Sequence, residues 1–419
     1  MSSPTFLLTP VGSSGDVHPF VGIGKALADR GHDVVIATSE PFRDLIEKAG
    51  LRFIAGITRE EYDEIMADPD LWHPRKGLKL VLRSVGSHLR GAYDRLTEIC
   101  DPETTVLVGH SLAFAARVFE ETHKVRAATI HLAPPAFRSL ISPMAHAPGK
   151  DMGRLPMWLK RATMAMVDRL LIDPHIVPGL NALRRDLGLA PVSRPFKDWI
   201  HSPRLTLGLF PSWFCEPQPD WPKTVRLTGF PLFDEDDQHA ASPELETFLE
   251  AGDPPIVFTP GSAHRYAGQF FAAAIDATTH LQRRALLLTR YAEQLPEVLP
   301  SHVRHESYVP LGRLLPRCAA IVHHGGIGTT AQGFAAGIPQ LTWPLGFDQP
   351  DNSTRLKRLG VGGWVVPRQF TGSRVAAALQ RLLTDESVAR SCRRWQARMA
   401  EDDPVRDTCE LLEGLAAGD

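Results

Sequence analysis

The feature that most constrains the fold is a strand–turn–helix pattern built around clustered glycines. In the second half of the chain an apolar run, Ala319 to Val322, enters the turn His323-His324-Gly325-Gly326-Ile327-Gly328. A helix-compatible segment, Thr329 to Ala336, follows the turn. A short buried run, a Gly-rich turn and a helix are the parts from which parallel, doubly wound sheets are built.

The first half opens with the same pattern. The sequence predicts a strand over Thr5 to Thr9, a turn over Gly12 to Asp16, a helix over Val21 to Arg30 that Gly31 ends, and a strand over Asp33 to Thr38. This βαβ order indicates a parallel sheet. Further strands are predicted over Val106–Val108, Ala127–Ile130, Arg204–Phe210, Pro255–Thr259, Ala285–Thr289, Ala319–His323 and Gln340–Trp343. The predicted class is therefore α/β, with two doubly wound Rossmann-like domains that face one another across a cleft.

Two boundaries divide the chain. Five prolines between Pro211 and Pro231 and the acidic run Asp234–Asp237, which we interpret as a solvated surface loop, indicate a connection between domains. We predict an N-terminal acceptor-binding domain over residues 1–215, a linker over 216–240 and a C-terminal nucleotide-sugar-binding domain over 241–395. A helical tail over 396–419 is predicted to pack back on the N-terminal domain.

Composition narrows the class of protein. The 419 residues carry a net charge of −2, which argues against a general nucleic-acid binder. The five cysteines form no C-x-x-C pair, so a reduced, cytoplasmic setting without a zinc site or disulfide framework fits best. No apolar run reaches the roughly 20 residues that cross a bilayer, and the N-terminus lacks a basic signal region. Membrane contact is expected to be peripheral at most.

The second-half turn predicts an anion site. The N-terminus of the helix after it carries backbone N–H groups that no carbonyl accepts within the helix, and such ends bind phosphates. The residues assigned to this site are His324, Gly326, Gly328 and Thr329, with Ser262 approaching from the turn after Thr259. Asp348 and Gln349 offer acceptor and donor groups to adjacent sugar hydroxyls.

A sugar transfer also needs a base that takes the proton of the acceptor hydroxyl. Asp16 follows the Gly-rich turn of the first half and is the candidate. The alternative is that Asp16 only caps the helix that begins there. His18, two residues later, competes as the base, although the pattern favours an ordinary, partly exposed first-turn histidine.

Metal and dinucleotide sites are not indicated. Asp-x-Asp occurs at Asp68–Asp70 and Asp234–Asp236, but neither pattern follows a predicted strand, so both are interpreted as surface patterns. Gly22-x-Gly24 lies within a predicted helix and lacks the rest of a dinucleotide-binding fingerprint. The helix N-terminus and His324 are expected to supply the positive potential that a divalent cation would otherwise bring.

Methionines indicate an apolar acceptor. Five of the eight lie between Met144 and Met166, where Leu159, Ala162, Met166 and Leu170 form one helical stripe beside basic residues. Methionine suits surfaces that accept varied apolar ligands. We predict an acceptor channel that includes Met157 and Met166 and opens toward a membrane surface, for a lipid or similar alcohol. A packed helix with a solvated basic edge is the alternative.

Together these motifs resemble a known family. The opening Gly12-x-x-Gly15-Asp16-Val17-x-Pro19, the turn His324-Gly-Gly-x-Gly-x-Thr330 and the pair Asp348-Gln349 are similar to family 1 glycosyltransferases of the GT-B fold. Within that family the strongest likeness is to the rhamnosyltransferases of rhamnolipid biosynthesis. The stretches that carry this likeness are Ala67–Pro74, His201–Pro203, Phe210–Trp213, Asp220–Pro222 and Thr228–Asp234.

The resemblance assigns further roles. It implies that Asp16 is the base, that Tyr308 stacks on the nucleobase and that the backbone of Val309 pairs with it. Gln332 stands where the family has a Glu that grips both ribose hydroxyls. Because Gln loses the charge-assisted, bidentate grip, deoxythymidine diphosphate suits the site modestly better than uridine diphosphate. Trp72 and His18 are the residues expected to contact the acceptor.

The resulting hypothesis is an inverting, metal-independent transferase with a nucleotide sugar as co-substrate and no other cofactor. It moves rhamnose from dTDP-rhamnose, or glucose from UDP-glucose, onto a hydroxyl of a hydrophobic acceptor such as a hydroxy-fatty acid lipid. A UDP-glucosyltransferase acting on a sterol, terpenoid, polyketide or phenolic product is the alternative. An epimerase or phosphorolytic enzyme on the same scaffold and a non-catalytic auxiliary subunit stay open as other classes.

Overall fold

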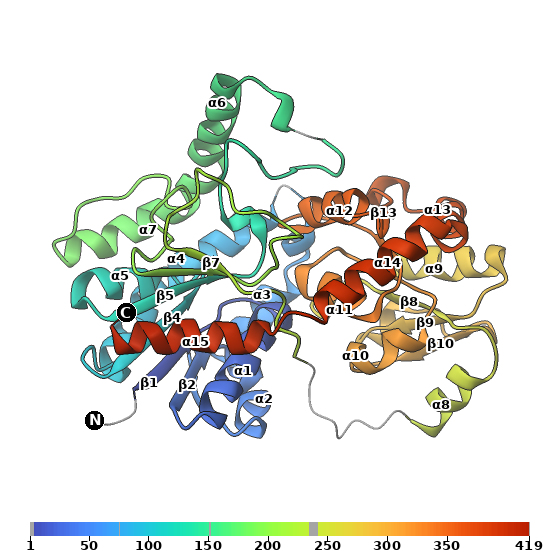
Figure 1. Cartoon of the computed structure of the whole chain (residues 1–419), viewed down its shortest axis with the longest axis horizontal. Helices are drawn as coiled ribbons and strands as arrows, with labels where there is room; N and C mark the ends of the chain where they lie inside the picture. Colours follow the sequence, from blue (N-terminus) through green and yellow to red (C-terminus); the bar gives the residue numbers. More distant parts are fainter. Residues whose placement is uncertain (1–3, 75, 151, 234–241, 419) are drawn as a thin grey trace. The chain divides into compact units, whose positions relative to one another are not determined.

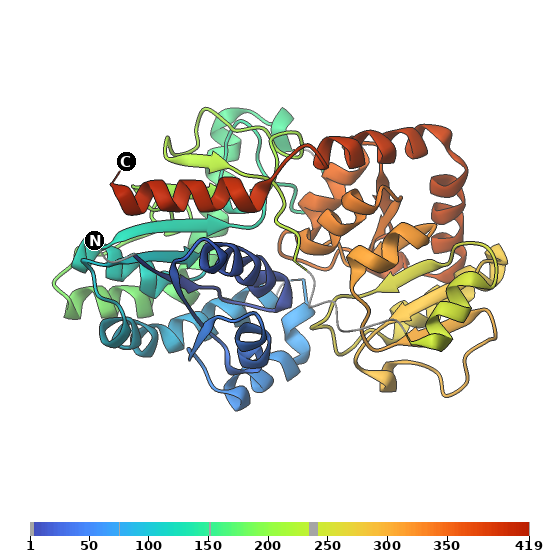
Figure 2. The same cartoon turned by 60° about the horizontal axis from the view of Figure 1, so that its bottom comes forward.

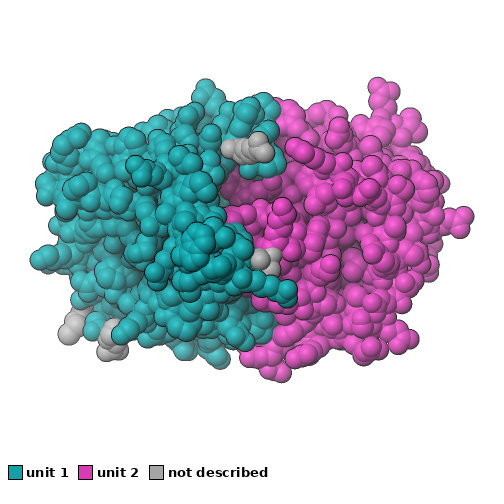
Figure 3. Space-filling model, turned by 90° about the horizontal axis from the view of Figure 1, so that it is seen from above, with its two compact units in different colours: residues 1–144, 151–233, 403–419 teal, residues 145–150, 234–402 magenta. Residues whose placement is uncertain are grey.

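The chain divides into two compact units. The computed structural model describes residues 4–74, 76–150, 152–233 and 242–418. Unit 1 comprises residues 1–144, 151–233 and 403–419, and unit 2 comprises residues 145–150 and 234–402 (Figure 3). The acidic run Asp234–Asp237, and with it the second Asp-x-Asp pattern, lies outside the described residues.

Unit 1 is built on a seven-stranded sheet in the order β3-β2-β1-β4-β5-β6-β7, with every neighbouring pair parallel. Because β1 lies between β2 and β4, the strand order reverses beside it, and the carboxyl ends of β1 and β4 form the topological switch point. The strands are β1 (Thr5–Thr9), β2 (Asp33–Thr38), β3 (Arg52–Ala55), β4 (Thr105–His110), β5 (Arg126–His131), β6 (Leu205–Gly208) and β7 (Val225–Leu227).

Helices cover both faces of this sheet (Figures 1 and 2). The helices of unit 1 are α1 (Ser14–Asp29), α2 (Arg43–Lys48), α3 (Arg59–Ala67), α4 (Gly77–Ile99), α5 (Phe114–His123), α6 (Met157–Val167) and α7 (Asp173–Asp186), with α15 (Pro404–Ala417) from the end of the chain. A five-residue π-helix, Asp168–Ile172, joins α6 to α7. No helix among the described residues combines the length and the apolar character that crossing a membrane requires.

The structure differs from the local predictions in unit 1 at three places, of which the first is the unpredicted edge strand β3. The first helix begins at Ser14 rather than Val21, because Ser13 and Asp16 form a capping box that starts the helix inside the predicted turn. Arg204–Phe210 was predicted to be the last strand of the first half, yet β7 follows within the predicted linker. The three residues of β7 stand between Pro222 and Gly229, which makes the strand too short for an alternating pattern to show.

Unit 2 repeats the architecture with a six-stranded parallel sheet in the order β10-β9-β8-β11-β12-β13. Its switch point lies between β8 and β11. The strands are β8 (Ile256–Thr259), β9 (Ala285–Leu288), β10 (Val303–Glu306), β11 (Ala320–His323), β12 (Gln340–Thr342) and β13 (Gly362–Trp364). The helices are α8 (Pro243–Glu250), α9 (Gly268–Leu281), α10 (Leu311–Leu314), α11 (Ile327–Ala336), α12 (Gln349–Arg358), α13 (Gly372–Thr384) and α14 (Glu386–Met399).

The last helix returns to unit 1. α15 packs against α1, β4 and β5 (Figure 1). The Glu413 carboxylate accepts from the Arg30 guanidinium at 2.7 Å, and the buried Thr408 hydroxyl donates to Thr228 at 2.9 Å. Cys409 is fully buried in the same contact. Residues 403–419 are therefore part of the core of unit 1.

Candidate active site

Asp16 is held at the start of α1 by the turn before it. Ser13 is the N-cap residue and Asp16 is the third residue of the helix, so Asp16 does not itself take the N-cap position. The Ser13 N–H donates to Asp16 Oδ2 at 2.8 Å, and the Ser13 hydroxyl donates to the same oxygen at 3.2 Å. A side chain at Gly12, whose φ is +139°, would put a Cβ 2.2 Å from that oxygen. The turn therefore needs glycine there, and it leaves Asp16 Oδ1 for other contacts.

His110 faces that second oxygen and was not predicted from the sequence. It ends β4, which lies beside β1 in the sheet, and its Nε2 is 3.8 Å from Asp16 Oδ1. The Leu112 N–H donates to His110 Nδ1 at 3.4 Å, which leaves the proton of the neutral ring on Nε2, toward Asp16. Burial lowers the pKa of His110, against the smaller opposing effect of the Asp16 charge. A neutral donor therefore faces the carboxylate at neutral pH.

A series of polar groups continues from the ends of β4 and β5. The Ser111 hydroxyl lies 2.7 Å from His131 Nδ1, and His131 Nε2 lies 2.9 Å from His201 Nδ1. Burial lowers the pKa of His131 well below its usual value and the pKa of His201 to about 4. Both rings are therefore neutral at neutral pH, and this part of the switch point is polar without being charged.

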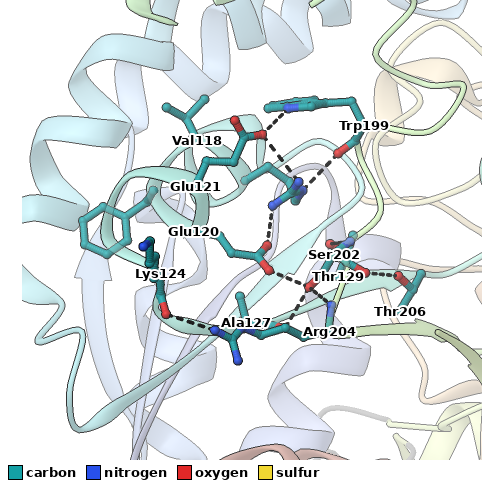
Figure 4. Close-up of polar contacts among 12 residues, drawn as sticks. Val118, Glu120, Glu121, Lys124, Ala127, Thr129, Trp199, Ser202, Arg204 and Thr206 are labelled. Carbon is teal, nitrogen blue, oxygen red and sulfur yellow. Dashed lines mark hydrogen bonds and ion pairs between the residues drawn. The ribbon is translucent and has the colours of Figure 1, made fainter. Parts of the chain in front are cut away.

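The loop that carries His201 is fixed by a buried polar network (Figure 4). The Ser202 hydroxyl lies 2.8 Å from a Glu120 carboxylate oxygen and 2.9 Å from the Ala127 carbonyl. Arg117 pairs with Glu120 and donates to the Trp199 carbonyl at 3.0 Å. Because Glu120 is buried, its pKa is raised. Such a satisfied network specifies one conformation of the loop.

The remaining predicted acceptor residues lie at three other places in unit 1. His18 lies in the first turn of α1, where its ring meets Phe233 edge to face with centroids 5.9 Å apart. Trp72 ends a short 3-10 helix, Pro69–Trp72, and is half-buried. Met157 and Met166 lie on α6 with 44% and 55% of their surfaces exposed. Their role in acceptor binding stays a prediction.

In unit 2, His324 follows β11 and lies over two backbone segments. A Cβ at Gly261 would approach His324 Cε1 to 2.9 Å, and a Cβ at Gly326 would approach Nε2 to 2.3 Å. The turns after β8 and β11, which carry Ser262 and Gly328, therefore meet at the imidazole. Burial lowers the pKa of His324 to about 4. The ring is neutral at neutral pH, so the positive potential here comes from the N-terminus of α11. His324 was expected to contribute positive potential as well, but its neutral ring does not.

His323 supports this turn from beneath. The Gly325 N–H donates to His323 Nδ1 at 3.1 Å, and His323 Nε2 lies 3.1 Å from Gln340 Oε1. The Gln340 amide in turn donates to the Thr330 carbonyl at 3.1 Å. The strand, the turn and the first turn of α11 are thus joined by side chains with fixed donor and acceptor roles. This preorganisation directs the N–H groups of the helix end outward.

Asp348 and Gln349 begin α12 beside the same turn. Asp348 is the N-cap residue, and its carboxylate accepts from the Asn352 amide at 2.7 Å. The same amide donates to the Gly325 carbonyl at 2.9 Å. Gln349 Oε1 accepts from the Leu345 N–H at 2.7 Å. The Gln349 oxygen is thus engaged by backbone, and its amide N–H₂ is the group left for a ligand.

The comparisons with known proteins agree with this geometry. Residues 6–93 match the glycosyltransferase family 28 N-terminal domain, and residues 275–413 match the erythromycin biosynthesis protein CIII-like C-terminal domain. The chain is 32% identical to the O-mycaminosyltylonolide 6-deoxyallosyltransferase of Streptomyces fradiae over 98% of this chain and 97% of that protein. It belongs to the family 1 glycosyltransferases.

Solved structures show the same fold at lower identity. The kitacinnamycin glycosyltransferase superposes with a TM-score of 0.76 at 19% identity, covering 99% of this chain and 100% of that one. The glycosyltransferase VinC, in complex with dTDP, superposes with a TM-score of 0.68 at 19% identity, over 99% and 100% of the two chains. The fold is GT-B. With the Streptomyces relative and the matching family models, the chain is an enzyme of the hexosyltransferase class.

The predicted nucleoside contacts of the glycosyltransferase lie on separate elements. Tyr308 and Val309 follow β10, at the edge of the unit 2 sheet, where the Arg290 guanidinium lies 5.6 Å from the centre of the Tyr308 ring. Val309 packs against the apolar cluster beneath α10. Gln332 is buried in the second turn of α11. The common role of Tyr308 and His324 in binding the nucleotide is still a prediction.

The first acidic pattern has a structural explanation. Asp68 accepts from the Asp70 N–H at 2.8 Å and so caps a 3-10 helix. Asp70 pairs with Lys76 at 2.9 Å. Within the part of the chain that the structure describes, no group of three or more His, Cys, Asp or Glu side chains is arranged to hold a metal ion.

Proposed function

We propose that the glycosyltransferase transfers its sugar with inversion of configuration at the anomeric carbon, and that Asp16 is the base. The observation that carries this proposal is the environment of the Asp16 carboxylate. Ser13 holds one oxygen, the neutral His110 faces the other, and a third of the side-chain surface, 34%, is exposed. A carboxylate fixed at the switch point of a parallel sheet is in the place where ligands of such sheets bind.

The reaction then balances as one displacement. The acceptor hydroxyl gives its proton to Asp16 while its oxygen forms a bond to the anomeric carbon. The bond from that carbon to the β-phosphate oxygen breaks, and the electron pair leaves with the nucleoside diphosphate. The N-terminus of α11 and the neutral His324 donate hydrogen bonds to the charge that develops on the phosphate. One such donor contributes about 3–4 kcal/mol to transition-state stabilisation in comparable enzymes.

For the donor we propose a dTDP-activated 6-deoxyhexose such as rhamnose. Gln332 in place of a carboxylate weakens the grip on a ribose 2′-hydroxyl, which deoxythymidine lacks. The Streptomyces relative is named for transfer of a 6-deoxyhexose, and VinC was solved with dTDP. UDP-glucose is the competing donor, because a glutamine amide can still hold one ribose hydroxyl.

For the acceptor we propose an apolar molecule with an accessible hydroxyl, either a hydroxy-fatty acid lipid or a polyketide-like natural product. His18 and Trp72 in unit 1 supply a polar and an aromatic contact for it. No metal or other cofactor enters the proposed reaction, so excess EDTA should leave turnover unchanged. A rate that falls with EDTA and recovers with a divalent cation would overturn this part.

The test of the base is Asp16→Asn, assayed with dTDP- and UDP-sugars against hydroxy-fatty acid, sterol and phenolic acceptors. Asn keeps the size and the hydrogen bond from Ser13 but takes no proton, so kcat should fall by about 100-fold to 10,000-fold. The Kd for dTDP, from calorimetry, should stay near that of the wild type. His18→Gln is the matched control, and a larger loss there than in Asp16→Asn would transfer the role of base to His18.

The nucleotide is tested separately by thermal shift. A nucleotide at 100 times its Kd raises the free energy of unfolding by about 2.7 kcal/mol, so dTDP should stabilise the protein more than UDP at equal concentration. Gln332→Glu should reverse that preference, because a carboxylate binds both ribose hydroxyls. Equal thermal shifts for dTDP and UDP in the wild type and in Gln332→Glu would show that Gln332 does not determine the nucleotide preference. That result would not affect the proposed role of Asp16.

A further inference from the structure

The helix α6 has its polarity reversed relative to an ordinary surface helix. All of its residues are described, and the one that is buried is Lys160, which donates to the Leu140 carbonyl at 3.0 Å. The next buried side chain along the chain, Asp168, pairs with Arg138 and Arg194. Surface helices normally turn their apolar side inward and their charged side to water. Here Lys160 and Asp168 face the protein instead.

Several large apolar side chains of this segment face outward, although Val167 and Ile172 pack on the core of unit 1. Trp158 is 70% exposed, Met166 is 55% exposed and Leu170 is 61% exposed. With Ala162 they recur at every fourth residue and form one stripe along α6 and the π-helix. Of the twelve large apolar side chains that are exposed among the described residues, six lie between residues 155 and 171. Scattered apolar residues are normal on a surface, but a cluster of this kind marks an interaction site.

The charges beside the stripe are all positive. Arg154, Arg161 and Arg169 are exposed, and the one acid between residues 152 and 172, Asp168, is buried in its ion pairs. Figure 1 shows α6 standing away from the strands of the unit 1 sheet, so other elements do not cover it there. A raised helix with an apolar ridge, a tryptophan and flanking arginines has the composition of helices that lie in the headgroup region of a bilayer.

We propose that this face, defined as α6 and the following π-helix, docks the glycosyltransferase on an anionic lipid membrane. The apolar stripe enters the boundary between headgroups and acyl chains, and the three arginines contact lipid phosphates. A second copy of the chain fits less well, because a twofold contact would bring the same arginines of both copies together. Docking would place unit 1 where a poorly soluble acceptor is concentrated. The inference itself does not depend on which sugar is transferred.

The test is cosedimentation of the full chain with vesicles. We expect binding to vesicles of mixed phosphatidylcholine and phosphatidylglycerol, weaker binding to phosphatidylcholine alone, and release by salt. Trp158→Ser combined with Leu170→Ser should abolish binding. Each of Arg161→Gln and Arg169→Gln should lower the partition coefficient by roughly fivefold. Val298→Ser, at a site 84% exposed in unit 2, is the matched control and should bind like the wild type.

Folding and oligomeric state are measured on the same samples. The Tm of each variant, and its turnover with a water-soluble acceptor, should match the wild type because the substituted side chains are exposed. Absence of wild-type binding to the mixed vesicles, or equal binding by the Trp158/Leu170 variant, overturns the proposal. A dimer in light scattering that this variant loses, without any vesicle binding, assigns the face to a second copy instead. None of these results bears on the role of Asp16, which is tested by the kcat of Asp16→Asn.

Discussion

The turns after β1 and β11 lead into their helices in nearly the same way, but the two helix starts carry opposite charge. In α1 the N-cap, second and third helical residues are Ser13, Gly15 and Asp16. In α11 the corresponding residues are Gly326, Gly328 and Thr329. Each helix start carries partial positive charge from its unpaired N–H groups. The first turn satisfies that charge with its own carboxylate, whereas the second has none in its first turn.

The two turns differ in charge at the third helical position. Asp16 accepts from the Ser13 N–H and places a negative charge at the start of α1, which repels phosphate and suits the proposed role as base. Thr329 carries no charge, so the N-terminus of α11 favours an anion. In the proposed mechanism, the choice of Asp or Thr therefore gives two similar turns different roles in the transfer.

The largest expected effect comes from making the second turn resemble the first. Thr329→Asp should raise the Kd for dTDP on the order of 1,000-fold, because two like charges about 4 Å apart repel by about 4 kcal/mol at an effective dielectric of 20. Isothermal titration calorimetry measures it. Thr329→Asn has the same shape without the charge and should bind within a fewfold of the wild type. An unchanged Kd for the Asp variant would show that the diphosphate does not bind at the start of α11.

A smaller effect should follow from removing the partner of the base. His110→Leu removes the Nε2–H that faces Asp16 Oδ1 at 3.8 Å. A contact of this length is weaker than a hydrogen bond to a charged group, which is worth about 1.5–3 kcal/mol, so kcat should fall by no more than about 10-fold. The donor Kd should not change, because the contact lies in unit 1. His110→Gln, which keeps an N–H donor, should recover part of the rate at the same Tm. Equal losses in both variants would point to packing rather than to the N–H group.

The smallest effect is expected at the joint between α12 and the second turn. Asn352→Ala removes the amide that bridges Asp348 and the Gly325 carbonyl. Loss of about 1 kcal/mol should raise the donor KM roughly fivefold and leave kcat nearly unchanged. Thr354→Val, on the same helix but bonded to Gly149 and Pro350, serves as the comparison variant. A fall in kcat instead would place Asn352 closer to the reacting atoms than the bridge suggests.

The sequence predicts the central strands and the two Gly-rich turns well, because buried parallel strands and clustered glycines are local patterns. β1 and β2 have the predicted bounds, and β8 and β11 begin one residue later than predicted. β7 was missed because three residues carry too little pattern. The edge strands β3, β10 and β13 were missed as well, since four or fewer residues of mixed polarity do not show an alternating pattern.

The sequence predicts the parts of the candidate site that come from one stretch of chain. It does not predict the contacts that depend on the order of strands in the sheet. The residues of the second turn follow from one stretch of chain. The contact between Asp16 and His110 requires that β4 pair with β1, which no local pattern specifies. The reversed polarity of α6 was also hidden, because the stripe that ends in Met166 and Leu170 has the spacing of an ordinary buried face. Only the buried Lys160 and Asp168 show which side faces the protein.

The return of α15 to unit 1 has a consequence for how the protein is made. When the ribosome has synthesised every residue of unit 2, the last helix of unit 1 has not yet been made. Until residues 403–419 emerge, the surfaces that Thr408 and Cys409 later cover stay open to water. Unit 2 can therefore finish folding first although unit 1 starts the chain. A fragment cut at the connection near residue 234 would keep unit 1 in that unfinished state.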